Sequence, residues 1–441
     1  MIGNKNIFVK KKILIYGLGK SGLSSYFFLK KNNDVYLYDD KKNIIRNKKI
    51  KKLLIKSNYF NKINIDFVLV SPGINIKKCQ LKNFLKENFK KIITDLDVFY
   101  SHYSKNKNIT ITGTNGKSTT AKILFDVLKK QKRDVRLTGN IGNPILAERK
   151  ITPKTIFVIE ASSYQIEYSK NFKANYATIL NITPDHLERH GTFASYVKAK
   201  FKLIRKQGNK DYSFLDLNNK FLKKEIKKKK INSKIINVNI KTTNQDLLKI
   251  KNAYFLTEGN KQNLLHVFSV VKKLNLNKSI LFKTLDTFKG LKFRQQIIYK
   301  SKKLTLINDS KATSYSSSIN ILKSLKKVYW IVGGIPKTGD KFLMPKNQCS
   351  NIKAYIFGRN KNSFIKELKN KMKYEHFDGL KKVLKKIILD IKEEKKMKDH
   401  KTILFSPSAA SFDSFKNFED RGEKFNKLIK QLNFKNTINA R

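Results

Sequence analysis

The chain has 441 residues, of which 40% are hydrophobic and 11% aromatic, and its formal net charge is +62. This apolar content excludes a disordered chain, and the length predicts two or three domains. No apolar run approaches the ~20 residues that a membrane-spanning helix needs. The run at residues 13–16 is too short for a secretory signal peptide, and two cysteines are too few for a disulfide framework. We therefore expect a cytoplasmic protein.

The positive charge is spread along the chain rather than gathered in one segment. Of the 95 basic residues, 10 are arginine, the residue that best reads bases and grips phosphate. A dedicated nucleic-acid-binding protein is therefore the less favoured interpretation, and we expect no nucleic acid among the partners. The same charge would still attract anionic small substrates.

The first predicted block, residues 11–100, begins like a dinucleotide-binding unit. The turn Gly17–Gly22 has the G-x-G-x-x-G spacing between a strand and a helix, and Asp39 and Asp40 follow about 20 residues later. Taken alone, this pattern favours a nicotinamide or flavin enzyme. The same turn would serve any nucleotide diphosphate, or would need its glycines only for close packing. The predicted strands of this block are residues 13–16, 35–38 and 66–70.

The second block contains a glycine-rich segment, Gly113–Thr119, which we call the phosphate loop. An apolar run precedes it, and an apolar stripe at helical spacing follows it. Backbone N–H groups and the positive end of a helix dipole would meet at such a turn, which suits phosphate. Lys117 adds a mobile positive charge, and Ser118 offers a hydroxyl to a magnesium ion. Its glycine spacing departs from the general P-loop, so a chance Gly-Lys-Ser sequence is the alternative.

Two later strands of this block are predicted at residues 155–159 and 176–180. In an open parallel sheet, ligands bind beyond the carboxyl ends of the strands. Glu160 and the segment Asn181–His186 would therefore lie near the phosphates. A carboxylate and a histidine there could hold a metal ion, although both residue types are also common in ordinary loops.

A helix predicted at residues 192–206 places Tyr196, Lys200 and Leu203 on one face. Lys200 would then be partly buried, and a desolvated lysine can be a neutral nucleophile because its pKa is lowered. The alternative is a side chain that extends its amine to solvent.

The third block follows Gly290–Arg294 and is predicted to be another doubly wound α/β sheet, because strands alternate with helical patterns. Each strand ends at polar or glycine residues. The predicted strands are residues 304–308, 328–332, 354–357 and 402–405.

Together these segments resemble the Mur ligases of bacterial cell-wall synthesis over nearly the whole chain. The phosphate loop is similar to the family's ATP loop, and Asn181–His190 is similar to its second signature. Glu160–Gln165 and Gly139–Gly142 also fit. Several motifs in the family's order are far more specific than any one of them.

The third block resembles the D-glutamate-adding branch of this family. The Asp-Asn-Pro-Arg motif of the branch that adds diaminopimelate or lysine is absent. The nearest rival is folylpolyglutamate synthase, a relative that lacks a UDP site in its first block. The segments that carry the resemblance are Asn308–Ser314, Gly333–Gly334 with Lys337, Ser406–Asp413 and Phe418–Gly422. The chain departs from the family pattern at Lys41, Gly259, Phe293 and Gln296.

The resemblance implies an ATP-dependent amide ligase that works through an acyl phosphate. Its implied substrates are UDP-N-acetylmuramoyl-L-alanine and D-glutamate, its implied cofactor is Mg²⁺ as two ions, and a monomer is expected. The implied domains are a Rossmann-like UDP-binding domain at residues 1–100, an ATP-binding domain at 101–295 and a Rossmann-like amino-acid-binding domain at 296–441.

The resemblance also implies roles for individual residues, including a carbamylated lysine at position 200. The implied catalytic residues are Lys117, Glu160, His186 and Lys200, and the implied metal ligands are Ser118, Glu160, His186 and Lys200. The implied ATP-binding residues are Gly113, Thr114, Asn115, Gly116, Lys117, Ser118, Thr119, Asn260, Arg294 and Asp309. The implied substrate-binding residues are Ser21, Asp39, Asp40, Gly73, Asn140, Gln165, Lys311, Thr313, Lys337, Ser411 and Phe418.

Overall fold

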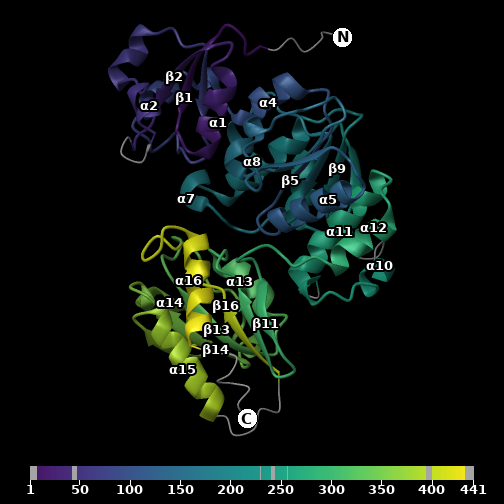
Figure 1. The fold of residues 1–441 in the computed structure, drawn as a ribbon, viewed down its shortest axis with the longest axis vertical. Coiled ribbons are helices and arrows are strands. Elements are labelled where there is room, and N and C mark those ends of the chain that lie inside the picture. Colours follow the sequence, from purple (N-terminus) through teal and green to yellow (C-terminus); the bar gives the residue numbers. More distant parts are fainter. Residues whose placement is uncertain are drawn as a thin grey trace. The chain divides into compact units, whose positions relative to one another are not determined.

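The computed structural model describes residues 7–41, 47–228, 230–239, 244–255, 257–393 and 400–432. This part of the chain contains three β-sheets with helices packed against them, which confirms the predicted α/β class (Figure 1). The chain divides into two compact units. Unit 1 comprises Met1–Lys249 and Asn263–Leu285, and unit 2 comprises Ile250–Gln262 and Asp286–Arg441. Unit 1 contains two of the sheets and unit 2 contains the third.

The first sheet of unit 1 has four parallel strands in the order β2-β1-β3-β4. The chain leaves β1 toward one side for β2 and returns to the other side for β3. The turns after β1 and β3 therefore meet at a switch point, where α/β sheets bind ligands. The strands are β1 (Lys12–Tyr16), β2 (Asp34–Tyr38), β3 (Phe67–Val70) and β4 (Ile92–Ile93). The helices are α1 (Lys20–Leu29), α2 (Lys48–Lys52), η2 (Ser57–Lys62), α3 (Lys82–Glu87), η3 (Phe89–Lys91) and α4 (Asp95–Tyr103).

The second sheet has six parallel strands in the order β10-β9-β8-β5-β7-β6. β5 is an interior strand, and the phosphate loop follows it directly. The strands are β5 (Asn108–Thr112), β6 (Val135–Gly139), β7 (Ile156–Glu160), β8 (Tyr176–Ile179), β9 (Tyr212–Leu215) and β10 (Lys234–Asn237). The accompanying helices are α5 (Lys117–Lys130), η4 (Ile145–Ala147), α6 (Ser163–Tyr168), α7 (Leu187–His190), α8 (Phe193–Arg205), α9 (Lys220–Lys228), α10 (Asn244–Leu248), α11 (Glu258–Lys273) and α12 (Lys278–Asp286).

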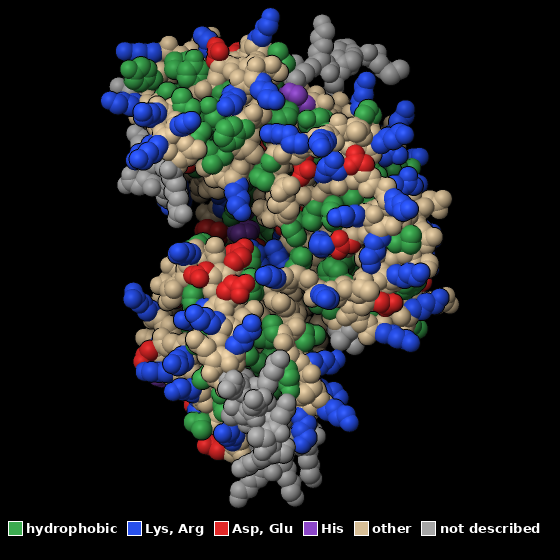
Figure 2. Space-filling view, viewed as in Figure 1, with side chains coloured by type: hydrophobic (Ala, Val, Ile, Leu, Met, Phe, Trp, Pro, Cys, Tyr) green, Lys and Arg blue, Asp and Glu red, His purple; other side chains and the backbone are tan. Residues whose placement is uncertain are grey.

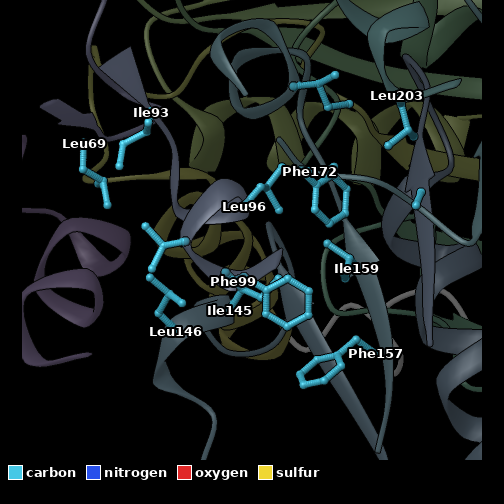
Figure 3. Close-up of a cluster of buried hydrophobic side chains, with 14 of the residues drawn as sticks. Leu69, Ile93, Leu96, Phe99, Ile145, Leu146, Phe157, Ile159, Phe172 and Leu203 are labelled. Carbon is cyan, nitrogen blue, oxygen red and sulfur yellow. The ribbon is translucent and has the colours of Figure 1, made fainter. Parts of the chain in front are cut away.

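The two sheets of unit 1 share one hydrophobic core. Leu69 of β3 and Ile159 of β7 belong to the same cluster of buried side chains, which Figure 3 shows in part. The helix α4 and the short helix η4 supply Phe99 and Leu146 to it. Because burial of apolar surface is the main force in folding, this shared cluster makes the two sheets one compact unit.

The sheet of unit 2 has six strands in the order β11-β12-β16-β13-β14-β15. Five strands are parallel, but β11 is antiparallel to β12. The doubly wound prediction missed this strand, because the three-residue link 301–303 is too short for a crossover. The strands are β11 (Gln296–Lys300), β12 (Leu304–Asn308), β13 (Lys327–Gly333), β14 (Ile352–Phe357), β15 (Lys373–Phe377) and β16 (Lys401–Phe405). The helices are η5 (Ala253–Phe255), α13 (Tyr315–Leu322), η6 (Lys346–Gln348), α14 (Lys361–Leu368), α15 (Leu380–Glu393) and α16 (Phe418–Gln431).

Helices cover both faces of this sheet. Along β13, Tyr329 and Ile331 pack with α15 and α16, whereas Val328 and Trp330 pack with α13 and α14. The alternation explains why the strand reads as a continuous apolar run, since a parallel sheet covered on both faces buries every side chain.

The predicted strands of all three blocks are observed to within two residues at each end. Among the described helices, none is long and apolar enough to span a membrane. Lysine and arginine side chains are spread over the visible face of both units rather than gathered on one element (Figure 2).

Asp97 of α4 is a buried anchor within unit 1. Its Oδ1 accepts a hydrogen bond from Ser169 Oγ at 2.8 Å and from the backbone N–H groups of residues 170–172 at 2.7–3.1 Å. Its Oδ2 accepts the N–H of Thr94 at 2.9 Å. One carboxylate thus satisfies the donors of a segment 70 residues away and also caps its own helix.

Replacing Asp97 by alanine should lower the free energy of unfolding by about 3 kcal/mol, because several buried N–H groups lose their acceptor. Asp97→Asn should cost less, since its amide oxygen can still accept the bonds from residues 169–172. Urea unfolding measures both. Asp66→Ala is the matched control, because Asp66 accepts one exposed bond from Lys12 N. Equal losses for Asp97→Ala and Asp66→Ala would contradict the anchor role.

Candidate active site

The phosphate loop connects β5 to α5, as the sequence predicts. Gly116 is the N-cap of α5 and has φ = 83°, a left-handed conformation that favours glycine. A Cβ at this position would lie 1.9 Å from Oδ1 of Asn263. The loop therefore requires glycine here both for its backbone conformation and for the close approach of α11.

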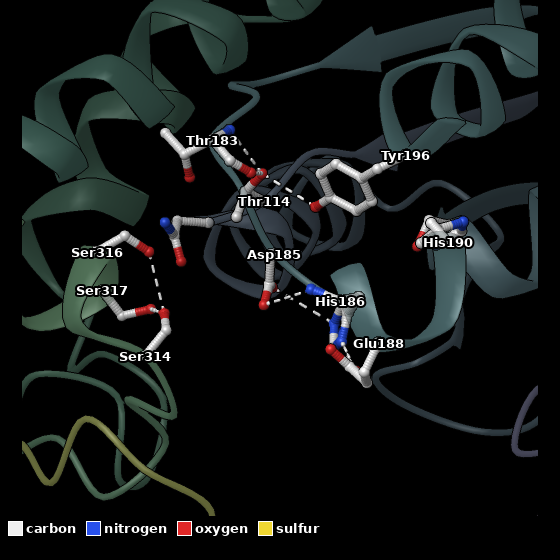
Figure 4. Close-up of polar contacts among 12 residues, drawn as sticks. Thr114, Thr183, Asp185, His186, Glu188, His190, Tyr196, Ser314, Ser316 and Ser317 are labelled. Atoms are coloured by element: carbon white, nitrogen blue, oxygen red, sulfur yellow. Dashed lines mark hydrogen bonds and ion pairs between the residues drawn. The ribbon is translucent and has the colours of Figure 1, made fainter. Parts of the chain in front are cut away.

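The loop is fastened to the segment after β8. Thr114 Oγ1 donates to Thr183 O at 3.1 Å and accepts from Thr183 N at 3.0 Å, and it also contacts the hydroxyl of Tyr196 at 3.0 Å (Figure 4). Asn181 Oδ1 accepts the N–H of Asn115 at 2.8 Å. The two predicted signatures thus form one hydrogen-bonded structure at the carboxyl ends of β5 and β8.

Ser118 and Glu160 meet beside the loop. Ser118 Oγ donates to Glu160 Oε2 at 2.5 Å, and Glu160, the last residue of β7, is 2% exposed. A hydroxyl and a carboxylate are the hard oxygen donors that Mg²⁺ takes from a protein, with phosphate and water completing its shell. Lys117 Nζ lies over the loop and donates to Gly113 O at 2.9 Å and Thr114 O at 2.7 Å.

Lys200 is wholly buried rather than partly buried, with 1% of its surface exposed. Its Nζ donates to Gly113 O at 2.8 Å and lies 4.6 Å from the ring centre of Tyr196. Burial, reinforced by the charge of Lys117, holds the pKa of this amine well below its ordinary value, while Asp185 and Glu160 act in the opposite direction. The alternative of a side chain reaching solvent is wrong, and the amine is suited to react in its neutral form.

His186 has φ = 56° and ends the segment Asn181–His186, which is hydrogen-bonded to the phosphate loop. Its Nε2 lies 3.4 Å from Asp185 Oδ2, and its Nδ1 lies 3.5 Å from Glu188 Oε1 (Figure 4). The centre of its ring lies 5.0 Å from that of Tyr164. Within the described ranges, no three His, Cys, Asp or Glu side chains are grouped closely enough to hold a metal ion.

The turn Gly17–Gly22, which we call the nucleotide turn, lines a cavity of about 480 Å³ at the switch point of the first sheet. Ser71 Oγ donates to Gly17 O at 2.6 Å and holds the turns after β1 and β3 together. Five of the predicted substrate-binding residues lie in its wall: Ser21, Asp39, Asp40, Gly73 and Asn140. The wall also contains Lys20, Lys41, Lys78 and Cys79.

Both acidic residues of this wall hydrogen-bond to the protein. Asp39 Oδ2 accepts the N–H of Leu18 at 2.6 Å, and its Oδ1 accepts the N–H of Lys41 at 2.8 Å. Asp40 Oδ1 accepts the hydroxyl of Tyr16 at 2.6 Å. In a dinucleotide-binding unit, the acid after the second strand binds the ribose. Here both oxygens of Asp39 also accept backbone N–H groups, so this acid helps to close the turn.

Gln165 lies apart from this cavity wall. It is 2% exposed, and its Oε1 accepts from Ser162 N at 3.1 Å and from Ser162 Oγ at 3.2 Å. Gln165 thus completes the capping box at the start of α6. The structure gives it a structural role that the sequence reading did not include.

In unit 2, the predicted ATP-binding residues lie around the carboxyl end of β12. Asp309 is 6% exposed, and its carboxylate accepts from Gln295 N and Ser406 Oγ, both at 3.0 Å. Burial raises its pKa to about 7, while these bonds and the charge of Arg294 act in the opposite direction. Asn260 Nδ2 donates to Tyr254 O at 2.7 Å and to Gln295 Oε1 at 3.1 Å.

The predicted amino-acid-binding residues follow three neighbouring strands of unit 2. Lys311 and Thr313 follow β12, Lys337 follows β13, and Ser411 follows β16. Because β12, β16 and β13 are adjacent and parallel, these residues share one edge of the sheet. Phe418 begins α16, so its N–H is one of those without an acceptor in its own helix. Lys311 Nζ lies 3.8 Å from the ring centre of Phe418.

Arg421 lies in Phe418–Gly422, one of the segments that carry the family resemblance, but it was not predicted as a site residue. It is fully buried and donates from Nη2 to Ser310 O at 2.7 Å and from Nε to Ser310 Oγ at 3.1 Å. Burial lowers its pKa to about 10. Tyr196, which contacts both Thr114 and Lys200, was also missed. A tyrosine one helical turn before the predicted lysine was the available signal.

Comparison with known sequences finds similar proteins over nearly the whole chain. The family models described as "Mur ligase MurD-like, N-terminal domain" and "Mur ligase middle domain" match residues 11–93 and 111–281. A Rickettsia felis protein named UDP-N-acetylmuramoylalanine--D-glutamate ligase is 33% identical, with 97% of this chain and 98% of that protein covered. A protein of the same name from Wolbachia of Brugia malayi is 29% identical, with 97% and 98% covered.

Comparison with solved structures shows the fold. MurF from Thermotoga maritima, solved in complex with ADP, superposes with a TM-score of 0.56 at 15% identity, covering 97% of this chain and 99% of that one. MurF from Acinetobacter baumannii gives 0.56 at 18% identity, covering 76% and 79%.

Asp309→Asn should flatten the pH dependence of stability. The pKa of this aspartate is 3.8 in the unfolded chain, whereas burial raises the pKa to about 7 in the folded protein. Between those values the unfolded state is favoured by ionisation, so the wild type should lose stability as the pH rises from about 4 to 7. Urea unfolding of both proteins across this range measures the difference. Parallel pH curves for the two proteins would contradict it.

Proposed function

The chain belongs to the Mur ligase family, and on this premise we propose that it joins D-glutamate to UDP-N-acetylmuramoyl-L-alanine at the expense of ATP. The observation that carries the proposal is the similarity to ligases of that name over 97% of the chain, which includes every site segment described above. The fold match to an ADP-bound relative supports ATP as the nucleotide.

In unit 1, the proposed reaction begins with transfer of the γ-phosphoryl group to the substrate carboxylate. The backbone N–H groups of the phosphate loop and the amine of Lys117 stabilise the phosphate charges. The cavity at the Gly17–Gly22 turn would hold the UDP group, with Lys20, Lys41 and Lys78 supplying positive charge. The product of this step is an acyl phosphate.

Ser118 and Glu160 would hold Mg²⁺, which when bound supplies charge neutralisation for the phosphates. We assign Glu160, His186 and Lys200 to a second ion, with Lys200 as a carbamate. The buried neutral amine of Lys200 supports this assignment, because carbamylation requires an unprotonated amine and converts it into an oxygen ligand. Asn260, Arg294 and Asp309 are assigned to the adenine, phosphates and ribose.

In unit 2, Lys311, Thr313, Lys337, Ser411 and the backbone of Phe418 are the proposed D-glutamate-binding residues. Two lysines and a helix N-terminus suit a substrate with two carboxylates. The D-glutamate amine then attacks the acyl carbon, phosphate leaves, and an amide forms.

We further propose a monomer that works in the cytoplasm. Its domains would be residues 1–100, 101–295 and 296–441, which bind the UDP substrate, ATP and the amino acid respectively.

The test is ADP release with UDP-N-acetylmuramoyl-L-alanine, comparing D-glutamate with L-glutamate, lysine and diaminopimelate. ADP release that depends on D-glutamate supports the proposal.

Lys117→Ala should lower the rate of ADP release by about 100-fold or more, because the phosphate charge loses its cation. Lys122→Ala is the matched control, since Lys122 is on the same helix and pairs with Asp126. Preference for another amino acid, or normal turnover by Lys117→Ala, would refute the assignment.

Lys200→Ala should abolish activity and regain part of it when short carboxylic acids are added, because such an acid can supply the lost oxygen ligand. The measurement is ADP release over a range of acetate and propionate concentrations. Lys198→Ala, on the exposed side of the same helix, should be active without any acid. Full metal affinity in Lys200→Ala together with no rescue would argue against the carbamate.

A further inference from the structure

Arg189 of α7 is a buried cation with open hydrogen-bonding capacity. It is 8% exposed, and its guanidinium carbon lies 4.5 Å from the ring centre of Tyr164. Its Nε and Nη2 are shielded from solvent and have no hydrogen-bond partner among the residues that the structure describes. These two N–H groups point in parallel on one edge of the guanidinium, so they form a fork for a ligand with lone pairs.

Two further open groups lie beside this fork. Glu167 Oε2 and His190 Nδ1 are also buried without a hydrogen-bond partner in the described part of the chain, and they lie 3.7 Å apart. His190 Nε2 is engaged with Ser163 Oγ at 2.9 Å. Burial raises the pKa of Glu167, while the charge of Arg189 and the side chain of Tyr168 act in the opposite direction, so Arg189 and Tyr168 are both neighbours of Glu167.

Leaving such groups unpaired is costly. A buried polar group without a partner costs about 1–3 kcal/mol, and an unpaired charge costs more. A buried polar group that stays unpaired in a folded protein therefore calls for an explanation, such as a functional role or a bound water or ion.

The cluster adjoins both ends of the proposed substrate path within unit 1. Tyr164, on which Arg189 stacks, packs on His186 at 5.0 Å. On the other side, Glu167 interacts electrostatically with Lys77, the neighbour of Lys78 in the wall of the nucleotide-turn cavity. The cluster therefore has one neighbour in the segment after β8 and another beside the wall of the cavity.

We propose that Arg189 and Glu167 form a receptor for a secondary amide of the first substrate. The amide oxygen accepts from the Nε and Nη2 fork, and the amide N–H donates to Glu167 Oε2. A phosphate or carboxylate would suit the fork alone but would be repelled by Glu167, whereas an amide satisfies donor and acceptor together. The inference rests on the proposed function, whose substrate carries an acetamido amide and a lactyl-alanyl amide. Arg189 and Glu167 are positioning residues in this assignment.

Calorimetric titration of the full chain without ATP tests the receptor. The three ligands are UDP, UDP-N-acetylglucosamine, which has the acetamido amide, and UDP-N-acetylmuramoyl-L-alanine, which has both amides. Arg189→Lys keeps the charge and loses the fork. It should weaken binding of the full substrate about 10-fold or more and leave UDP binding unchanged. If Arg189→Lys also weakens binding of UDP-N-acetylglucosamine, the fork binds the acetamido amide. If it weakens binding of the full substrate alone, the fork binds the lactyl-alanyl amide.

Glu167→Gln distinguishes an amide from an anion in the fork. If Glu167 accepts an amide N–H, this variant should weaken binding several-fold, because a neutral acceptor is poorer than a carboxylate. Tighter binding would indicate an anion and overturn the proposal. Unchanged affinity of Arg189→Lys for the full substrate, or an equal loss for UDP, would also overturn it.

Arg136→Lys is the control, because Arg136 already pairs with Asp134 and Glu148. It should bind all three ligands like the wild type, and a urea unfolding transition in every variant should show that each is folded. If the wild type binds the full substrate but releases no ADP with D-glutamate, the ligase proposal fails while the receptor can still be judged.

Discussion

A buried amine beneath the phosphate loop is the constraint on which the site of unit 1 depends. Lys200 donates from α8 to the carbonyl of Gly113, and Tyr196 of the same helix contacts Thr114. One helix thus fixes two consecutive residues of the loop from below. Because Lys200 is desolvated, its pKa is lowered, so the burial that places its amine against the loop also favours the neutral form of that amine.

Further hydrogen bonds join the phosphate loop and its helix to the ends of the neighbouring strands. Thr114 and Asn115 are fastened to the strand end after β8, and Glu160 at the end of β7 receives the hydroxyl of Ser118. All of these positions lie at carboxyl ends of adjacent parallel strands, where the topology concentrates polar groups. The shared core beneath the two sheets keeps the nucleotide-turn cavity and the phosphate loop in one compact unit.

Much of this arrangement could be predicted from the sequence, because apolar runs that end at glycine or polar residues mark strands and their functional ends. The grouping of Ser21 and Gly73 around one cavity follows from parallel topology, because they lie after β1 and β3 of the same sheet. Other features depend on contacts between distant residues, which periodicity does not encode. Examples are the antiparallel β11, the cap formed by Gln165, and the burial of Arg421 against Ser310.

The hydrogen bond from Leu18 to Asp39 has a consequence for selectivity among nucleotides. A cell contains abundant nicotinamide and flavin dinucleotides, and their ribose hydroxyls seek a free acid beyond the second strand of such a fold. Here that acid is already occupied by the backbone of its own turn. A ribose hydroxyl arriving there would share carboxylate oxygens that already accept the N–H groups of Leu18 and Lys41, so a dinucleotide would gain less from this acid than from one without such bonds.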